Sequence, residues 1–349
     1  MTSPFTCTYD FRVRVLWPLV QEDVWGNVST RLSPVSIDGF LSFAACAARN
    51  IEKKGVWEMP ENELPKLGVT MLATCHTLPP DRLAKEVEDR GFESLWLPEH
   101  SHIPSSRLTP FPGAAPGREE LPDVYWHLND QLVSLSMAAA ATERLVLGTA
   151  VTLVAQHDPV WLAKQIATLD FHSGGRVELG VGFGWNREEY ETHGHKFADR
   201  YTRTQDNIGI MKALWTQDEA AFEGALQSLE PSWSWPKPTR SIPLLIGGGS
   251  GPRLLKHLFE WGDGWMPIRS PKGSFTKEVV KVRRLAEDAG RDPASISMTV
   301  MNAPKSIEEL EELSLLNVDR LVFTIWPQDP DAVLLELEGL TDIVDSFVS

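Results

Sequence analysis

From Lys66 onward, short apolar runs alternate with longer segments of helical periodicity, and this alternation restricts the possible folds more than any other feature of the chain. Most of the runs are continuously apolar, as is typical of strands in a parallel sheet that is covered on both faces. Gly and Asp-Pro lie where the intervening helices are expected to begin or end. Eight strands are predicted, at 67–73, 94–97, 145–154, 177–181, 242–246, 264–268, 296–301 and 321–325.

Eight strand–helix units favour a (β/α)8 barrel, an α/β fold, over an open doubly wound sheet. Two connections, 99–122 and 217–241, are longer than is usual between a strand and a helix. Because the loops that follow barrel strands build the C-terminal face, we expect both connections to form lids or walls there. Trp233 and Trp235 lie beside two prolines in the second connection and are expected in such a lid; simple loop packing is the alternative.

Residues 1–65 contain no repeated strand–helix unit, and Met59 resembles an ordinary protein start just before the first strand. We therefore expect two parts. Residues 1–65 would be an accessory or misassigned N-terminal extension, and residues 66–349 would be the barrel domain. A small segment that caps the barrel bottom is the alternative for the first part.

Composition excludes several classes of partner. The formal net charge of −15 argues against nucleic acid or an anionic membrane surface. Cys7, Cys46 and Cys75 form no CxxC pair, which fits a reducing cytoplasm and gives neither a disulfide framework nor a zinc site. No apolar run approaches the roughly 18 residues of a membrane span. We expect a cytoplasmic protein with a small-molecule substrate; its oligomeric state stays open, a homodimer included.

The predicted strand 242–246 runs directly into Gly247, Gly248, Gly249 and Gly251, after which Pro252 opens a helix. Glycine lets backbone N–H groups approach an anion, and a helix N-terminus adds unpaired donors and a positive dipole end. Arg253 adds a charge that can fork onto phosphate. The run therefore predicts a phosphate site, and a tight turn without a ligand is the alternative.

The other predicted strand ends carry many glycines and aromatic residues, and one carboxylate beside an imidazole, Glu99-His100. This mixture suits a flat aromatic cofactor lying against backbone better than a hydrolytic dyad. The chain here resembles the bacterial luciferase-like oxidoreductases, over about residues 66–330. The motifs that carry the resemblance are 92–100 (FESLWLPEH), 147–151 (LGTAV), 157–159 with 163–164 (HDP, AK), 168–170 with 173–176 (TLD, SGGR), 180–185 (GVGFGW), 247–252 (GGGSGP) and 262–264 (GDG). The resemblance is strongest to the actinobacterial branch that uses the deazaflavin coenzyme F420, although members that use FMN share most of these motifs.

The resemblance implies roles for individual residues. His100 would lie beside the reactive carbon of the deazaflavin ring, and Glu99 would help to set its tautomer or protonation. Ala150-Val151 matches a β-bulge with a non-prolyl cis peptide that backs the ring. The remaining matched positions would hold the cofactor: Phe183, Gly184 and Trp185 over the ring, Gly248, Gly249 and Gly251 at the phosphate, with Trp265 and Met266 closing round the phosphate or tail. Trp185 also stands where the sugar-phosphate dehydrogenases of the family carry a catalytic Glu, so that substrate class is disfavoured.

These features predict an oxidoreductase that transfers hydride between F420 and a small organic substrate. An FMN-dependent monooxygenase is the near alternative, and a cofactor-binding protein without activity is another. His100-Ser-His102 also raises a metal-dependent amidohydrolase, but strand eight ends at Trp326 and not at the Asp that such a site needs. We expect no metal: His193 and His195 form an HxH pair with no third or fourth ligand in the sequence around them. A loop-bracing role is the alternative for His100.

Overall fold

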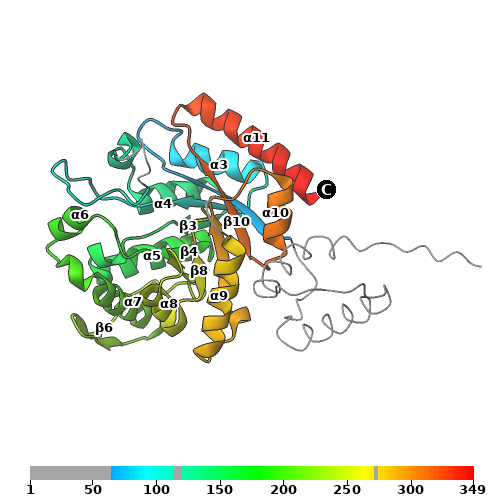
Figure 1. Ribbon diagram of the computed structural model, residues 1–349. Helices are drawn as coiled ribbons and strands as arrows, with labels where there is room; N and C mark the ends of the chain where they lie inside the picture. The colour runs from blue at the N-terminus through cyan, green and yellow to red at the C-terminus, as the bar shows by residue number, and fades with distance from the viewer. Residues whose placement is uncertain (1–63, 114–119, 271–273) are drawn as a thin grey trace, which may run out of the picture. The chain divides into compact units, whose positions relative to one another are not determined.

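The computed structural model describes residues 64–113, 120–270 and 274–349. Eight parallel strands close into a barrel in which neighbours in sequence are neighbours in space, and β10 pairs with β1 to complete the ring. This confirms the predicted (β/α)8 barrel, which Figure 1 shows with its helices around the strands. The barrel strands are β1 (Lys66–Met71), β2 (Ser94–Leu97), β3 (Val146–Thr149), β4 (Val177–Val181), β7 (Leu244–Gly247), β8 (Gly264–Met266), β9 (Ser297–Met301) and β10 (Arg320–Ile325).

The helices begin and end at the residues that local chemistry favours. In α5, for example, the Asp158 side chain accepts hydrogen bonds from the N–H groups of Val160 and Trp161, Pro159 is the first residue, and Gly174 ends the helix at φ 73°. The other α-helices are α3 (Pro80–Asp89), α4 (Gln131–Ala141), α6 (Arg187–Thr192), α7 (Arg200–Thr216), α8 (Pro252–Trp261), α9 (Phe275–Asp288), α10 (Ile307–Ser314) and α11 (Pro330–Val348). The described residues also form four short 3-10 helices: η1 (Asp123–Trp126), η2 (Val154–Gln156), η3 (Phe197–Asp199) and η4 (Pro293–Ser295).

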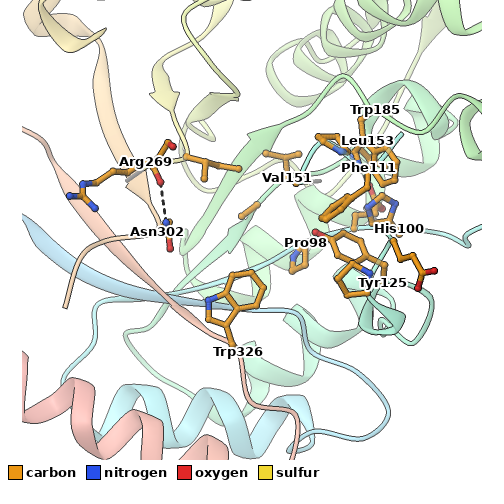
Figure 2. A pocket seen from close by; sticks show the side chains of 18 residues that line it. Pro98, His100, Phe111, Tyr125, Val151, Leu153, Trp185, Arg269, Asn302 and Trp326 are labelled. Carbon is orange, nitrogen blue, oxygen red and sulfur yellow. Dashed lines mark hydrogen bonds between the residues drawn. The ribbon is translucent and has the colours of Figure 1, made fainter. Parts of the chain in front are cut away.

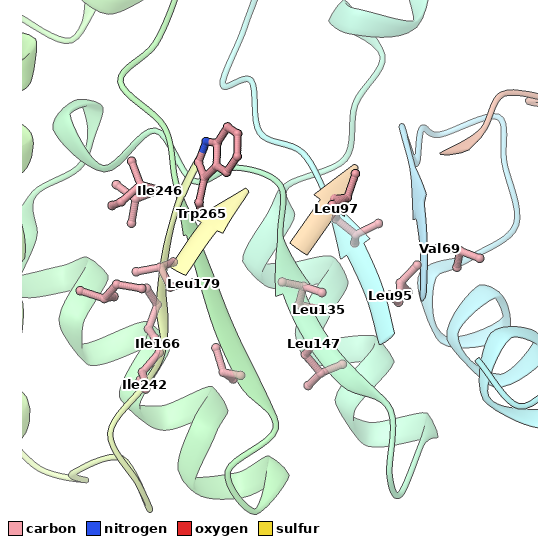
Figure 3. Close-up of a cluster of buried hydrophobic side chains, with 14 of the residues drawn as sticks. Val69, Leu95, Leu97, Leu135, Leu147, Ile166, Leu179, Ile242, Ile246 and Trp265 are labelled. Carbon is pink, nitrogen blue, oxygen red and sulfur yellow. The ribbon is translucent and has the colours of Figure 1, made fainter. Parts of the chain in front are cut away.

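The main hydrophobic core lies between the strands and the helices. Figure 3 shows Leu95 and Leu147 from neighbouring strands in one cluster with Leu135 from α4, all fully buried. A second, smaller cluster consists of Trp96, Leu245, Met266, Met301 and Val322. Ala150 and Val151 pack against this second cluster, so it supports the segment that follows β3.

One buried cation joins three strands at their N-terminal ends. Arg320, the first residue of β10, donates from Nε to Glu93 at 2.7 Å and from Nη1 to Glu178 of β4 at 2.9 Å. The Arg320 side chain is 6% exposed, so its charge is compensated almost entirely by these two carboxylates. The network lies at the end of the barrel opposite the expected site.

Three local features differ from the predictions. The predicted strand 145–154 ends at Thr149, and the short helix α6 was not predicted. The connection 217–241 contains an antiparallel pair, β5 (Ala220–Glu223) and β6 (Ser228–Ser232). The predictions for residues 1–63 lie outside the described residues. Within the described part of the chain, no helix is both long and apolar enough to cross a membrane.

Candidate active site

A cavity of about 1200 Å³ opens at the carboxyl ends of the barrel strands. Residues from the ends of β2, β3, β4, β8, β9 and β10 line it, together with part of the connection 99–122, so that connection forms the wall that was predicted. Figure 2 shows aromatic side chains gathered at one end of the cavity, with Arg269 and Asn302 at the other and Val151 between them. The Trp233–Trp235 loop is not part of the lining. It lies against α5, where Lys164 donates to the Trp235 carbonyl, so the predicted lid is wrong.

The floor of the cavity is backbone. The Ala150-Val151 peptide is cis, as the resemblance implies, and both residues line the cavity. Two glycines enclose the Val151 side chain: a Cβ at Gly182 would come within 2.2 Å of Val151 Cγ2, and one at Gly247 within 2.5 Å of Cγ1. These glycines are therefore needed for close packing, and Val151 connects the floor to the start of the glycine turn after β7.

The His100 ring is hydrogen-bonded to a carboxylate of α6, the helix that follows β4. Its Nδ1 lies 2.7 Å from Oε2 of Glu189 in α6, and the second oxygen of Glu189 accepts the Ser101 N–H at 3.2 Å. The His100 and Glu189 side chains are 7% and 1% exposed, so this hydrogen-bonded pair is buried. Because Nδ1 is occupied, Nε2 is the ring nitrogen left for the cavity, and among the described residues it has no hydrogen-bond partner.

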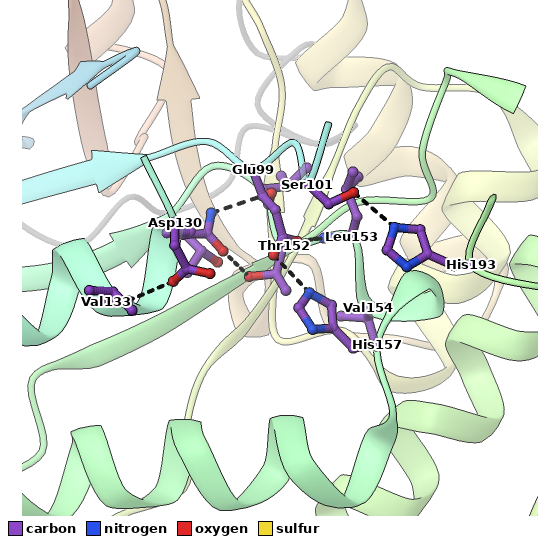
Figure 4. Close-up of polar contacts among 12 residues, drawn as sticks. Glu99, Ser101, Asp130, Val133, Thr152, Leu153, Val154, His157 and His193 are labelled. Carbon is purple, nitrogen blue, oxygen red and sulfur yellow. Dashed lines mark hydrogen bonds and ion pairs between the residues drawn. The ribbon is translucent and has the colours of Figure 1, made fainter. Parts of the chain in front are cut away.

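Glu99 does not contact the His100 ring, which corrects the expectation that it sets the protonation of that ring. Its Oε1 lies 2.7 Å from His157 Nε2, and its Oε2 accepts the Leu153 N–H at 2.5 Å (Figure 4). Burial lowers the pKa of His157, but the hydrogen bond and charge of Glu99 outweigh this effect and leave the pKa raised. Glu99 thus fixes the backbone just after the cis peptide.

Four rings meet edge to face at the His100 end of the cavity, and we call them the four-ring cluster: His100, Phe111, Tyr125 and Trp185. Their centroids are 5.5 Å apart for His100–Tyr125, 5.3 Å for Tyr125–Phe111, 6.0 Å for Phe111–Trp185 and 5.7 Å for Trp185–His100. Such distances and angles are typical of favourable aromatic pairs. Burial raises the pKa of the Tyr125 hydroxyl, which therefore stays protonated at neutral pH.

Helix α6 also anchors the loop that carries Phe111. Glu188 accepts the Thr109 hydroxyl at 2.6 Å and the Leu108 N–H at 2.8 Å. The hydrogen bond from the Thr109 hydroxyl is the main cause that lowers the pKa of Glu188 to about 2. Adjacent residues of one short helix, Glu188 and Glu189, thus position two sides of the four-ring cluster.

The glycine turn presents a smaller donor set than predicted. Gly248 has φ 132°, which only glycine adopts readily, and its N–H already donates to the Met266 carbonyl. Its carbonyl accepts the Trp265 indole N–H at 2.9 Å. Gly249 and Gly251 are exposed, and a Cβ at either would meet nothing within 4 Å. The N–H groups open to an anion are therefore those that follow Gly248, up to the N-terminus of α8.

The remaining predicted residues lie further from the cavity. Trp265 and Met266 are buried, so they support the turn and the floor from behind rather than closing round a ligand. Phe183 is also buried and stacks on Tyr201 at 4.5 Å, and Gly184, at φ 75°, turns the chain toward Trp185. Arg253 is exposed beside the turn, with its guanidinium carbon 4.9 Å from the centre of the Tyr201 ring.

His102 and His193, one from each HxH motif, both contact Ser101. Ser101 Oγ lies 2.9 Å from His102 Nδ1 and 2.8 Å from His193 Nε2, so a hydroxyl stands between the two imidazoles. In the described part of the chain, no group of three or more His, Cys, Asp or Glu side chains is arranged to hold a metal ion.

Sequence reasoning missed Glu189, Phe111 and Tyr125. The carboxylate pair Glu188-Glu189 follows the GVGFGW motif by only a few residues, and this proximity to a strand end could have drawn attention to it. Phe111 and Tyr125 lie in and just after a long irregular connection, where no periodicity indicates which side chains turn inward.

Comparison with known proteins places this geometry in context. A family model described as luciferase-like monooxygenase matches residues 81–314. An uncharacterized protein of Mycobacterium tuberculosis is 38% identical over 256 residues, 72% of this chain and 89% of that protein. The F420-dependent glucose-6-phosphate dehydrogenase of Amycolatopsis mediterranei is 28% identical over 296 residues, 74% of this chain and 84% of that enzyme. The coenzyme F420-dependent tetrahydromethanopterin reductase of Methanopyrus kandleri has the same fold, with a TM-score of 0.62 at 18% identity over 82% of this chain and 100% of that chain.

Proposed function

This chain belongs to the luciferase-like monooxygenase family of oxidoreductases, and we propose that it exchanges hydride between the deazaflavin coenzyme F420 and a small organic substrate. The observation that supports the proposal is that His100, the cis peptide and the glycine turn adjoin one another. His100 and the cis Ala150-Val151 peptide line one cavity, and Val151 contacts Gly247, the first glycine of the turn after β7.

The residues present fit such a cofactor. The backbone floor at Ala150 and Val151 offers a surface for a flat ring without a long side chain in the way. Open space beyond Gly249 and Gly251 at the N-terminus of α8 leaves room for a phosphate group. Arg253 stands beside that turn and can contribute its charge. When bound there, the deazaflavin would supply the carbon that accepts or releases the hydride.

His100 would accept or donate the proton that accompanies the hydride. Hydride transfer to or from a carbon that bears oxygen requires a proton to leave or reach that oxygen. With Nδ1 hydrogen-bonded to Glu189, the Nε2 atom of His100 can accept or donate this proton inside the cavity. Glu189 would keep the ring in one orientation during turnover and so act as a positioning residue.

Fluorescence titration of the cofactor-free protein with F420 and with FMN tests the proposed cofactor. We expect F420 to bind more tightly than FMN, because of the similarity to F420-dependent relatives and the open turn at Gly249–Gly251. Sub-micromolar FMN affinity without detectable F420 binding would contradict the proposal and favour an FMN-dependent monooxygenase, the other activity that the family name describes.

A further inference from the structure

The walls of the cavity indicate the class of substrate. Building on the proposed function, we infer that the substrate is an uncharged alcohol or ketone whose reacting carbon carries an aromatic or other flat apolar group. That group would lie against Phe111, Tyr125 and Trp185, with its oxygen at His100 Nε2.

The first support is the closed arrangement of the four-ring cluster. Each ring contacts two others, so His100 lies between the Tyr125 and Trp185 rings, and Phe111 contacts both of these. A polyhydroxylated substrate would find only the Tyr125 hydroxyl and His100 Nε2 as partners there, and its other hydroxyl groups would be left without hydrogen bonds, which is costly in a confined site. A flat apolar group would gain contact area and further edge-to-face packing.

A second support comes from the far side of the cavity. Ile268 and Trp326 line it and are 72% and 62% exposed, so large apolar surfaces are available to a ligand. The Tyr125 hydroxyl has no hydrogen-bond partner among the described residues and can supply one donor beside His100. The interior thus combines apolar walls with a few polar groups, as is common in small-molecule sites.

The charges of the described lining disfavour an anion. Glu120 contributes a carboxylate, Glu99 is paired with His157, and Arg269 lies 3.0 Å from Glu309, which compensates its charge. A sugar phosphate would therefore meet the carboxylate of Glu120, and the described lining offers it no uncompensated arginine or lysine. Trp185 adds to this argument because it is an apolar ring next to the acid–base residue.

The reaction balances with these groups alone and the proposed cofactor. In the oxidising direction, the C–H bond of the carbinol carbon breaks and its electron pair leaves as hydride to the deazaflavin. The O–H proton passes to His100 Nε2, the C=O bond forms, and the imidazolium is compensated by Glu189. Reduction of the ketone is the reverse of each step.

Calorimetric titration of the full chain loaded with oxidised F420 tests the inference, with acetophenone, acetone and glucose 6-phosphate as probes. The two ketones cannot turn over, because oxidised F420 has no hydride to give them. The three probes share an oxygen function and differ in apolar area and charge. We expect acetophenone to bind at least about tenfold more tightly than acetone, with glucose 6-phosphate weaker than acetophenone. Rates of ketone reduction with reduced F420, expressed as kcat/KM, should follow the same order for acetophenone and acetone.

A matched pair of variants locates the binding group. Phe111→Ala should weaken acetophenone binding about tenfold, the scale of one lost aromatic contact, with a smaller effect on acetone. Phe171→Ala removes the same side chain from the outer helix α5, where it is 51% exposed and does not line the cavity. It should change the binding of neither ketone by more than about twofold.

Two results would overturn the substrate class. One is acetone or glucose 6-phosphate binding as tightly as acetophenone, and the other is equal acetophenone affinity in the Phe111→Ala and Phe171→Ala proteins. F420 affinity is measured on each protein first. Normal F420 binding with either result refutes the substrate class only, whereas absent F420 binding refutes the proposed function.

Discussion

Two glutamates that could each serve His100 have separate functions in the structure. Glu99 is adjacent to His100 in sequence but binds His157 and the Leu153 N–H, whereas Glu189 reaches the His100 ring from α6. Adjacent residues at a strand end point in different directions, so sequence proximity is a poor guide to pairing at this position. The contact between His100 and Glu189 spans 89 positions, which only the closed barrel can bring together.

His100→Ala should lower turnover by about 10²-fold or more, because it removes the only imidazole nitrogen that the described cavity offers for proton transfer. F420 affinity should change far less, since the floor and the glycine turn remain. Glu189→Gln, which keeps the size of the side chain, should also lower turnover without loss of F420 binding. Steady-state kinetics per folded molecule and fluorescence titration measure both quantities.

The alternative for His100 is a loop-bracing role, and it predicts the opposite pattern. In that case His100→Ala would lose thermal stability while turnover per folded molecule stayed near normal. Near-normal turnover in this variant would remove His100 from the reaction.

Gly249→Val should weaken F420 binding while leaving the barrel folded. Apart from the neighbouring residues, a Cβ at this position would meet no atom within 4 Å, so the added side chain would extend into the space proposed for the phosphate. Gly339→Val on α11 is a matched control, because Gly339 is also exposed with nothing within 4 Å and lies outside the cavity lining. Unchanged F420 affinity in Gly249→Val, with a normal circular dichroism spectrum, would place the phosphate elsewhere.

At the scale of elements, apolar runs predict all eight barrel strands because strands buried on both faces must be apolar throughout. The sequence does not predict the short helix α6, because this helix has almost no apolar face. It has six residues, only Glu189 and Tyr190 of which are buried, so its sequence shows no apolar periodicity. Its functional side chains are the carboxylates Glu188 and Glu189, whose partners lie in a loop remote in sequence.

The opposite end of the barrel allows a pH prediction. Burial raises the pKa of Glu93, but the hydrogen bond and charge of Arg320 outweigh this and leave the pKa lowered. A carboxylate with a lowered pKa in the folded state stabilises the protein above the unfolded pKa of about 4.3, and this contribution is lost as the pH falls. Glu93→Gln should therefore cost about 2 kcal/mol at pH 7, and the difference from wild type should shrink toward acidic pH.

Denaturant unfolding of both proteins between neutral and acidic pH measures this effect. Glu219→Gln is the control, because Glu219 is exposed and lies outside the barrel strands, between α7 and β5. A difference between Glu93→Gln and wild type that stays constant or grows as the pH falls would show that the ion pair does not stabilise the folded state in this way.

At the scale of the whole molecule, all eight strands of the closed barrel lie between Lys66 and Ile325. We therefore predict that removal of residues 1–58 leaves a folded barrel that binds F420. Thermal unfolding and F420 titration of the shortened and full chains test this. A melting temperature lowered by more than about 10 °C, which is several kcal/mol for a chain of this size, would mean that the N-terminal segment is integral to the fold.

The sequence predicts where the site lies better than it predicts which residues line it. Strand ends of a barrel meet at one face, so His100, Ala150, Val151 and Trp185 were expected together and do line one cavity. Phe183, Trp265 and Met266 match family motifs equally well, yet their side chains are buried. A motif identifies a backbone position, whereas the direction of a side chain depends on pleat, bulges and neighbouring strands that a single sequence does not reveal.

A crystal structure of the full chain with F420 would locate the proposed cofactor. We expect the deazaflavin ring against the Ala150-Val151 peptide, His100 Nε2 facing it, and the phosphate on the N–H groups between Gly249 and the start of α8. A ring bound outside this cavity, for example in the groove between α4 and α5 lined by Asp130 and Lys164, would refute this cofactor site.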